Sequence, residues 1–126
     1  MITDSPSAAG DIVLFMETLE PSVKSNVFNF AHHSKTLQNT IAMCSLADCC
    51  VSTDSSLIHL AASVGTPAFG LYGPFPGEVR LTTYENVDWI NAEKKCAPCF
   101  IHGHAPCYKS INGNSPCYDN IAQPHH

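Results

Sequence analysis

A short polar turn carries the residues of this chain that are best suited to hold an anion. Thr53-Asp54-Ser55-Ser56 follows one apolar run and precedes another. Ser and Asp before an apolar segment predict a helix start, where free backbone N–H groups and the helix dipole attract anions. The amides of Ser55, Ser56 and Leu57, with the serine hydroxyls, would hold a phosphate or diphosphate, and Asp54 would accept from a sugar hydroxyl. The alternative is that Asp54 or Ser55 only caps the helix.

A histidine follows on the same predicted helix. His59 lies four residues after Ser55, about one helical turn along and on the same face. Its ring could donate to a phosphate bound at the turn. The alternative is a packed, hydrogen-bonded histidine in an otherwise apolar helix.

A second cluster of chemically active residues lies in the last quarter of the chain. Four thiols occur there with intervals of two, seven and nine residues, at Cys96, Cys99, Cys107 and Cys117. His102 and His104 lie between them. Four thiolates suit tetrahedral Zn²⁺, and a Pro- and Gly-rich segment without its own core would gain order from the metal. Because the second C-x2-C of common zinc ribbons is missing, two disulfides and four packed, reduced thiols stay open. Each alternative gives the tail a structural role.

The apolar pattern predicts the helices and strands that position these residues. We expect helices over 11–20 (N-cap Asp11), 34–46 (N-cap Ser34) and 57–64, and strands over 27–30, 49–51, 68–72 and 87–90. Strand, helix and strand over 49–72 form a βαβ unit with parallel strands. The sequence therefore predicts an α/β fold, with a small parallel sheet covered by helices on both faces and a Cys-rich C-terminal tail.

The composition indicates one soluble, intracellular domain. The 126 residues suffice for one domain and not for two, and 44% hydrophobic with 13% charged residues is typical of a globule. Six Lys and Arg against 11 Asp and Glu argue against a nucleic-acid partner. The longest apolar run, 12–16, is far shorter than the roughly 20 residues of a membrane span. Residues 1–10 are small and polar, and we expect them to be disordered.

The central motif resembles a known family. TDSSLIHLAASVGTP at 53–67 and FGLYGP at 69–74 resemble the signature of glycosyltransferase family 9, the ADP-heptose:lipopolysaccharide heptosyltransferases. That signature reads D-[ST]-G-x-x-H-[LIV]-A, then G-x-P, a strand and [FY]-G-P. Residues 35–48 resemble the preceding helix and strand, and the tail cysteines resemble a C-x-P-C…C…C segment of many members. The resemblance covers roughly residues 26–121.

The resemblance implies a GT-B fold, in which two Rossmann-like domains enclose the substrates and the C-terminal one binds the nucleotide-sugar donor. Residues 11–95 resemble part of that C-terminal domain, and residues 96–126 a Cys-rich tail packing on the same domain. Carried over by position, the donor diphosphate and sugar site would consist of Asp54, Ser55, Ser56, His59 and Lys35. Ser56 stands where the family has glycine, so its side chain would crowd the phosphate or replace a backbone contact with a hydroxyl one.

The implied reaction is a metal-independent transfer of a sugar, a heptose, from an ADP-sugar to a lipopolysaccharide-type acceptor in the cytoplasm. Transfer would need no cofactor, and a zinc ion on the tail cysteines would be structural; a cytoplasmic location disfavours stable disulfides. Glu78 and Arg80 follow the Gly-Pro loop, where the resemblance suggests residues near the donor sugar.

In this family the acceptor site and the catalytic base belong to the N-terminal domain. We therefore assign no catalytic residue and expect the chain to be inactive alone, since transfer needs acceptor, base and donor in one cleft. A separate N-terminal domain or a second copy of the chain is the expected protein partner. The alternative function is a non-catalytic binding or assembly module stabilised by zinc or by a thiol cluster in its tail.

Overall fold

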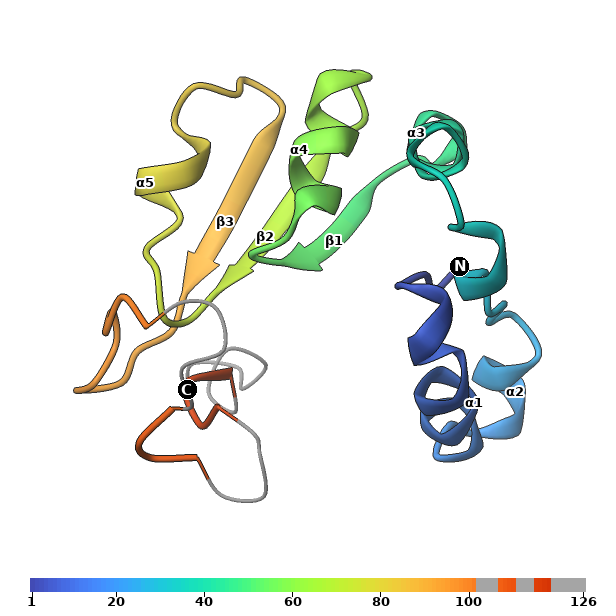
Figure 1. The fold of residues 1–126 in the computed structure, drawn as a ribbon, viewed down its shortest axis with the longest axis horizontal. Helices are drawn as coiled ribbons and strands as arrows, with labels where there is room; N and C mark the ends of the chain where they lie inside the picture. Colours follow the sequence, from blue (N-terminus) through green and yellow to red (C-terminus); the bar gives the residue numbers. More distant parts are fainter. Residues whose placement is uncertain (102–106, 111–114, 119–126) are drawn as a thin grey trace. The chain divides into compact units, whose positions relative to one another are not determined.

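The computed structural model describes residues 1–101, 107–110 and 115–118 of the chain. They belong to two compact units, Met1–Met43 and Cys44–His126. Figure 1 shows the elements of both units in chain order.

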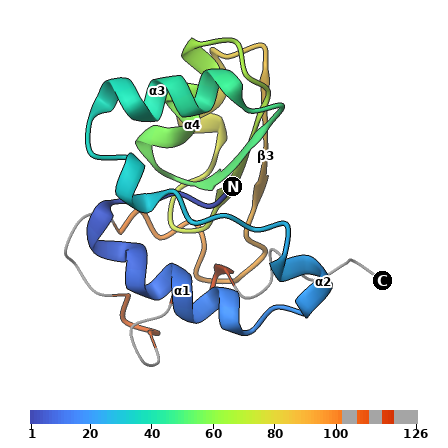
Figure 2. The same cartoon turned by 90° about the vertical axis from the view of Figure 1, so that its right-hand side faces the viewer.

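The first unit consists of short helices. Helix α1 (Ala9–Glu17) follows a 3₁₀ turn (Pro6–Ala8), and after a turn comes α2 (Pro21–Lys24); both helices are drawn in blue in Figure 2. A second 3₁₀ turn (Ala31–His33) precedes α3 (Leu37–Leu46), whose last turn enters the second unit.

Near the start of the chain, where we expect disorder over residues 1–10, the structure contains one backbone bridge. Ile2 pairs with Asn29 in a parallel bridge. The Ile2 N–H donates to the Phe28 carbonyl at 2.8 Å, and the Phe30 N–H donates to the Ile2 carbonyl at 2.8 Å. Ile2 also packs beside the buried side chain of Ile12. Segment 27–30, predicted as a strand, contributes this single bridge because its partner is one residue long.

Two predicted helix caps are wrong. Asp11 lies inside the first turn of α1, whose N-cap is Ala8. Thr36, rather than Ser34, caps α3, because its Oγ1 accepts from the Asn39 N–H at 3.1 Å. The hydroxyl of Ser34 instead bonds to that of Thr3.

The second unit contains the predicted parallel sheet. Its elements are β1 (Cys50–Thr53), α4 (Ser56–Ser63), β2 (Ala68–Tyr72), α5 (Glu78–Leu81) and β3 (Val87–Asn91). The strands run in the order β1-β2-β3, all parallel, with Cys50 beside Ala68 and Ala68 beside Val87. The βαβ unit is therefore confirmed, while the one-turn helix α5 has no counterpart in the prediction.

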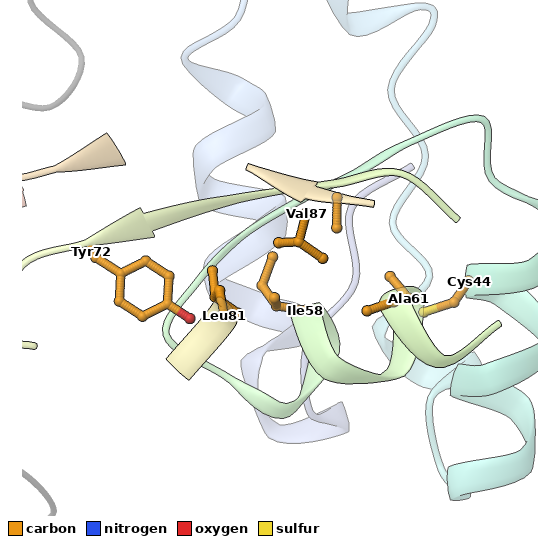
Figure 3. Packing of buried hydrophobic residues seen from close by; sticks show 8 residues of the cluster. Cys44, Ile58, Ala61, Tyr72, Leu81 and Val87 are labelled. Carbon is orange, nitrogen blue, oxygen red and sulfur yellow. The ribbon is translucent and has the colours of Figure 1, made fainter. Parts of the chain in front are cut away.

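Side chains of α4 and α5 form the core on one face of this sheet. Ile58 of α4, Leu81 of α5 and Tyr72 of β2 are fully buried and meet there (Figure 3). On alternate strand positions the side chains of Val51 and Phe69 are 60% and 39% exposed, so burial on both faces is not observed at these residues. The small parallel sheet flanked by helices nevertheless confirms the α/β class and a partial Rossmann-like arrangement.

Described parts of the cysteine-rich tail contact the loop after β2. The Phe100 N–H donates to the Pro74 carbonyl at 2.8 Å, and the Phe100 ring meets that of Phe75 edge-on. A side chain at Gly73 would lie 2.6 Å from the Cys117 sulfur, so the tail packs closely against this loop.

In the part of the chain that the structure describes, no helix has both the length and the apolar character needed to cross a membrane.

Candidate functional site

The candidate site lies where β1 and β2 end. Asp54 and Ser55 follow the last residue of β1, and Tyr72 is the last residue of β2. Because the strands are parallel, their carboxyl ends meet at one edge of the sheet, where open α/β sheets bind ligands.

Ser55 is the N-cap of α4. Its backbone is extended (φ −147°, ψ 166°), and its Oγ accepts from the Leu57 N–H at 3.3 Å. The hydroxyls of Ser52 and Ser55 are 2.8 Å apart. If Ser52 donates in that pair, the Ser55 proton stays available to a ligand, because a hydroxyl can accept two bonds while it donates one. Capping and ligand binding by Ser55 are therefore compatible.

Ser56, the first residue of α4, is exposed. Phe100 is the one non-glycine residue of the described ranges with a positive φ, so Ser56 replaces the glycine of the family pattern without backbone strain. Its hydroxyl and the first amides of α4 lie at the positive end of the helix dipole.

The Asp54 carboxylate is one fifth exposed and faces Arg80 of α5. Arg80 Nε lies 3.8 Å from Asp54 Oδ2, and the guanidinium carbon lies 4.9 Å from the centre of the Phe75 ring. The hydroxyl of the buried Tyr72 points toward α5 (Figure 3). Burial first, and then the nearby Asp54 carboxylate, raise the pKa of Tyr72 to about 12. The phenol is therefore protonated at neutral pH.

His59 is held from one side of its ring. Its Nδ1 lies 2.9 Å from the hydroxyl of Tyr84, and the two rings are 5.6 Å apart. If Tyr84 donates to Nδ1, the proton of neutral His59 is on Nε2, which can then donate to a ligand. The packed histidine that we set as the alternative is observed, and it leaves one nitrogen for chemistry.

Asp54, Ser55 and Ser56 thus lie at the start of α4, and His59 follows in the same helix. Lys35 is an exposed residue before α3 and belongs to the first unit.

Two tyrosines of the site were missed from the sequence. In the sequence, Tyr72 and Tyr84 look like ordinary apolar residues. Tyr72 lies near Asp54, 18 residues earlier in the chain, and Tyr84 contacts His59, 25 residues earlier, so no short-range pattern shows either pair. The family resemblance placed Arg80 only near the donor sugar. Arg80 is the single arginine of the chain, and this feature of the sequence could have marked it as a candidate anion contact.

The four tail cysteines line one cavity of about 190 Å³ beneath Pro74. Burial raises the pKa of the Cys117 thiol. A backbone hydrogen bond lowers it in part, and the other three tail thiols raise it further. All seven cysteines are free thiols. Among the residues described, no three His, Cys, Asp or Glu side chains are arranged to hold a metal ion. Four thiolates are ligands that suit zinc, but the described thiols are not arranged in space as a metal site. His102 and His104 lie outside the described residues.

The parallel sheet and its helices define an α/β protein, and the polar cluster lies at the edge of the sheet where open α/β sheets bind ligands. Residues 15–108, most of the chain, match the family model of glycosyltransferase family 9 (heptosyltransferase). The chain belongs to this family, whose general activity is sugar transfer. No curated protein and no solved structure matches the chain significantly.

Proposed function

We propose that this chain supplies the donor-binding part of a family 9 glycosyltransferase. The donor is a nucleoside-diphosphate sugar, an ADP-heptose-like molecule, and the acceptor is of the lipopolysaccharide type. Family membership supports sugar transfer in general. The observation that carries the proposal is the N-terminus of α4 at the carboxyl edge of the sheet, capped by Ser55 and flanked by Asp54 and His59.

Each side chain has a defined part in this proposal. The amides of Ser55 and Ser56 and the hydroxyls of the same two residues donate to the diphosphate. His59 Nε2 donates to the same group, and Asp54 accepts from sugar hydroxyls. Such donors stabilise the charge that grows on a departing diphosphate, so transfer proceeds without a metal ion. Lys35 stays a proposed nucleotide contact, carried over by position from the family resemblance.

Calorimetric titration with ADP tests this proposal. We expect the wild-type chain to bind ADP, and Ser55→Ala and His59→Ala to weaken binding about tenfold each, the loss of one hydrogen bond to a charged group. Ser63→Ala is the matched control, because it removes an exposed serine hydroxyl at the other end of α4, where it donates to the Leu60 carbonyl at 2.8 Å. Circular dichroism verifies that each variant folds. Unchanged affinity in both site variants refutes the diphosphate site.

A second candidate function is a non-catalytic binding or assembly module stabilised by the tail. The four thiols on one cavity favour this alternative. Elemental analysis of freshly purified, reduced protein separates its two forms: one equivalent of zinc supports a metal-bound tail, and well under one equivalent supports a cluster of packed thiols. Failure of ADP to bind a folded chain would favour this module over the transferase.

A further inference from the structure

Two buried hydrogen-bond donors near Asp54 have no hydrogen-bond partner among the described residues. Arg80 Nε lies 3.8 Å from the Asp54 carboxylate, close enough for an ion pair and too far for a hydrogen bond. The buried Arg80 Nε and the buried Tyr72 hydroxyl have no hydrogen-bond partner among the described residues. Arginine has only donors, and a protonated phenol keeps one. Buried donors without partners are rare in folded proteins and costly.

Arg80 is fixed in place and still accessible. The guanidinium carbon of Arg80 lies 4.9 Å from the centre of the Phe75 ring, and the guanidinium forms an ion pair with Asp54. About a third of the Arg80 side chain is exposed. Stacking on an aromatic ring leaves the edge of the planar guanidinium free for an anion. Asp54 directly precedes the cap of α4, an eight-residue helix, so this pair adjoins the helix N-terminus.

We propose that Arg80 and Tyr72 bind the phosphate oxygens of the donor diphosphate, together with the N-terminus of α4. This inference rests on the proposed function and assigns Arg80 to the phosphates rather than to the sugar. The guanidinium fork matches a tetrahedral oxyanion and donates two bonds to it. Asp54 positions Arg80 in the free protein and accepts from the sugar when the diphosphate engages the guanidinium. The oxyanion supplies the acceptors that the buried donors lack.

Chemical labelling tests this inference directly, because the chain has a single arginine. Phenylglyoxal modifies guanidinium groups, so mass spectrometry of the intact chain and of its peptides follows Arg80 alone. We expect saturating ADP to slow the labelling several-fold and adenosine at the same concentration to leave it unchanged. Equal labelling rates with ADP and with adenosine overturn the assignment.

Calorimetry of variants provides the second measurement. We expect Arg80→Met to weaken ADP binding about tenfold or more and Arg80→Lys to retain part of the affinity, because lysine keeps the charge without the fork. Tyr72→Phe should weaken binding several-fold. Lys109→Met is the matched control, since Lys109 also lies over a ring, at 5.7 Å from the centre of Tyr108. It should change the affinity less than about twofold.

The outcomes separate this inference from the proposed function. If wild-type ADP binding is absent in the folded chain, both fall. If ADP binds and is weakened by Ser55→Ala but not by Arg80→Met, the α4 site stands and the assignment of Arg80 is overturned. If Arg80→Met and Lys109→Met weaken binding equally, the effect is one of net charge, and the inference is overturned as well.

Discussion

Replacing Tyr72 with Phe should stabilise the protein, although Tyr72 is completely buried. The ring packs in the core against Leu81 and stays unchanged in the variant. The hydroxyl that is removed forms no hydrogen bond of normal geometry with a described residue, although it lies near the Asp54 carboxylate. An unsatisfied buried polar group costs about 1–3 kcal/mol. We therefore expect the free energy of unfolding of Tyr72→Phe to be about 1 kcal/mol higher at pH 8.

Alkaline pH should widen this difference. The pKa of Tyr72 is 10 in the unfolded chain and about 12 in the folded protein, where burial is the main cause and Asp54 the next. Because the pKa of Tyr72 is higher in the folded protein, the contribution of the protonated phenol to the free energy of unfolding is complete below pH 10. It is lost as the pH rises toward 12. From pH 9 to pH 11 the wild type should lose about 1.3 kcal/mol that the Phe variant keeps.

Urea unfolding followed by the fluorescence of the single tryptophan, Trp89, measures both effects. Tyr108→Phe serves as the control, because it removes the hydroxyl of a side chain that is 69% exposed and should change stability little at any of these pH values. A Tyr72→Phe variant that is less stable than wild type at pH 8 by 1 kcal/mol or more would refute the reasoning, since the hydroxyl must then have a partner.

Three further substitutions test the packing of the second unit by the same unfolding assay. Ile58→Ala should cost about 2–5 kcal/mol because Ile58 is fully buried, and a loss below 1 kcal/mol would contradict that core. Thr66→Val should cost about 1–3 kcal/mol, since the hydroxyl donates to the buried Cys44 carbonyl at 2.7 Å; equal stability of the two proteins argues against this bond. Gly77→Ala should cost about 1–3 kcal/mol and shift the fluorescence, because its Cβ would overlap the Trp89 ring, and an unchanged emission maximum would show that this contact is absent.

The sequence predicted the local features of the second unit well. Ser55 as a helix cap and the strands 68–72 and 87–90 follow from short-range rules. These features depend on a few consecutive residues, so their physical cause is present in the sequence itself. The same rules did not find α5, because a one-turn helix after a Gly-Pro loop shows no periodicity.

Local rules failed where a distant residue competes. Ser34 has the chemistry of a helix cap, but its hydroxyl bonds to Thr3, and Thr36 caps α3 instead. Ile2, within the segment where we expect disorder, pairs with Asn29. A short-range pattern cannot show either contact, because the partners are about 30 residues apart along the chain.

The sequence by itself determined the class of this protein, since the motif from Asp54 to His59 and the alternation of strand and helix indicated both the fold and the family. Only the tertiary structure decided which groups share the candidate site. It placed Arg80 beside Asp54, and Tyr84 on the ring of His59. It also left the hydroxyl of Tyr72 buried without a partner. The physical reason is that these groups come from different elements, and packing of α4 and α5 on the sheet is what brings them within reach of one another.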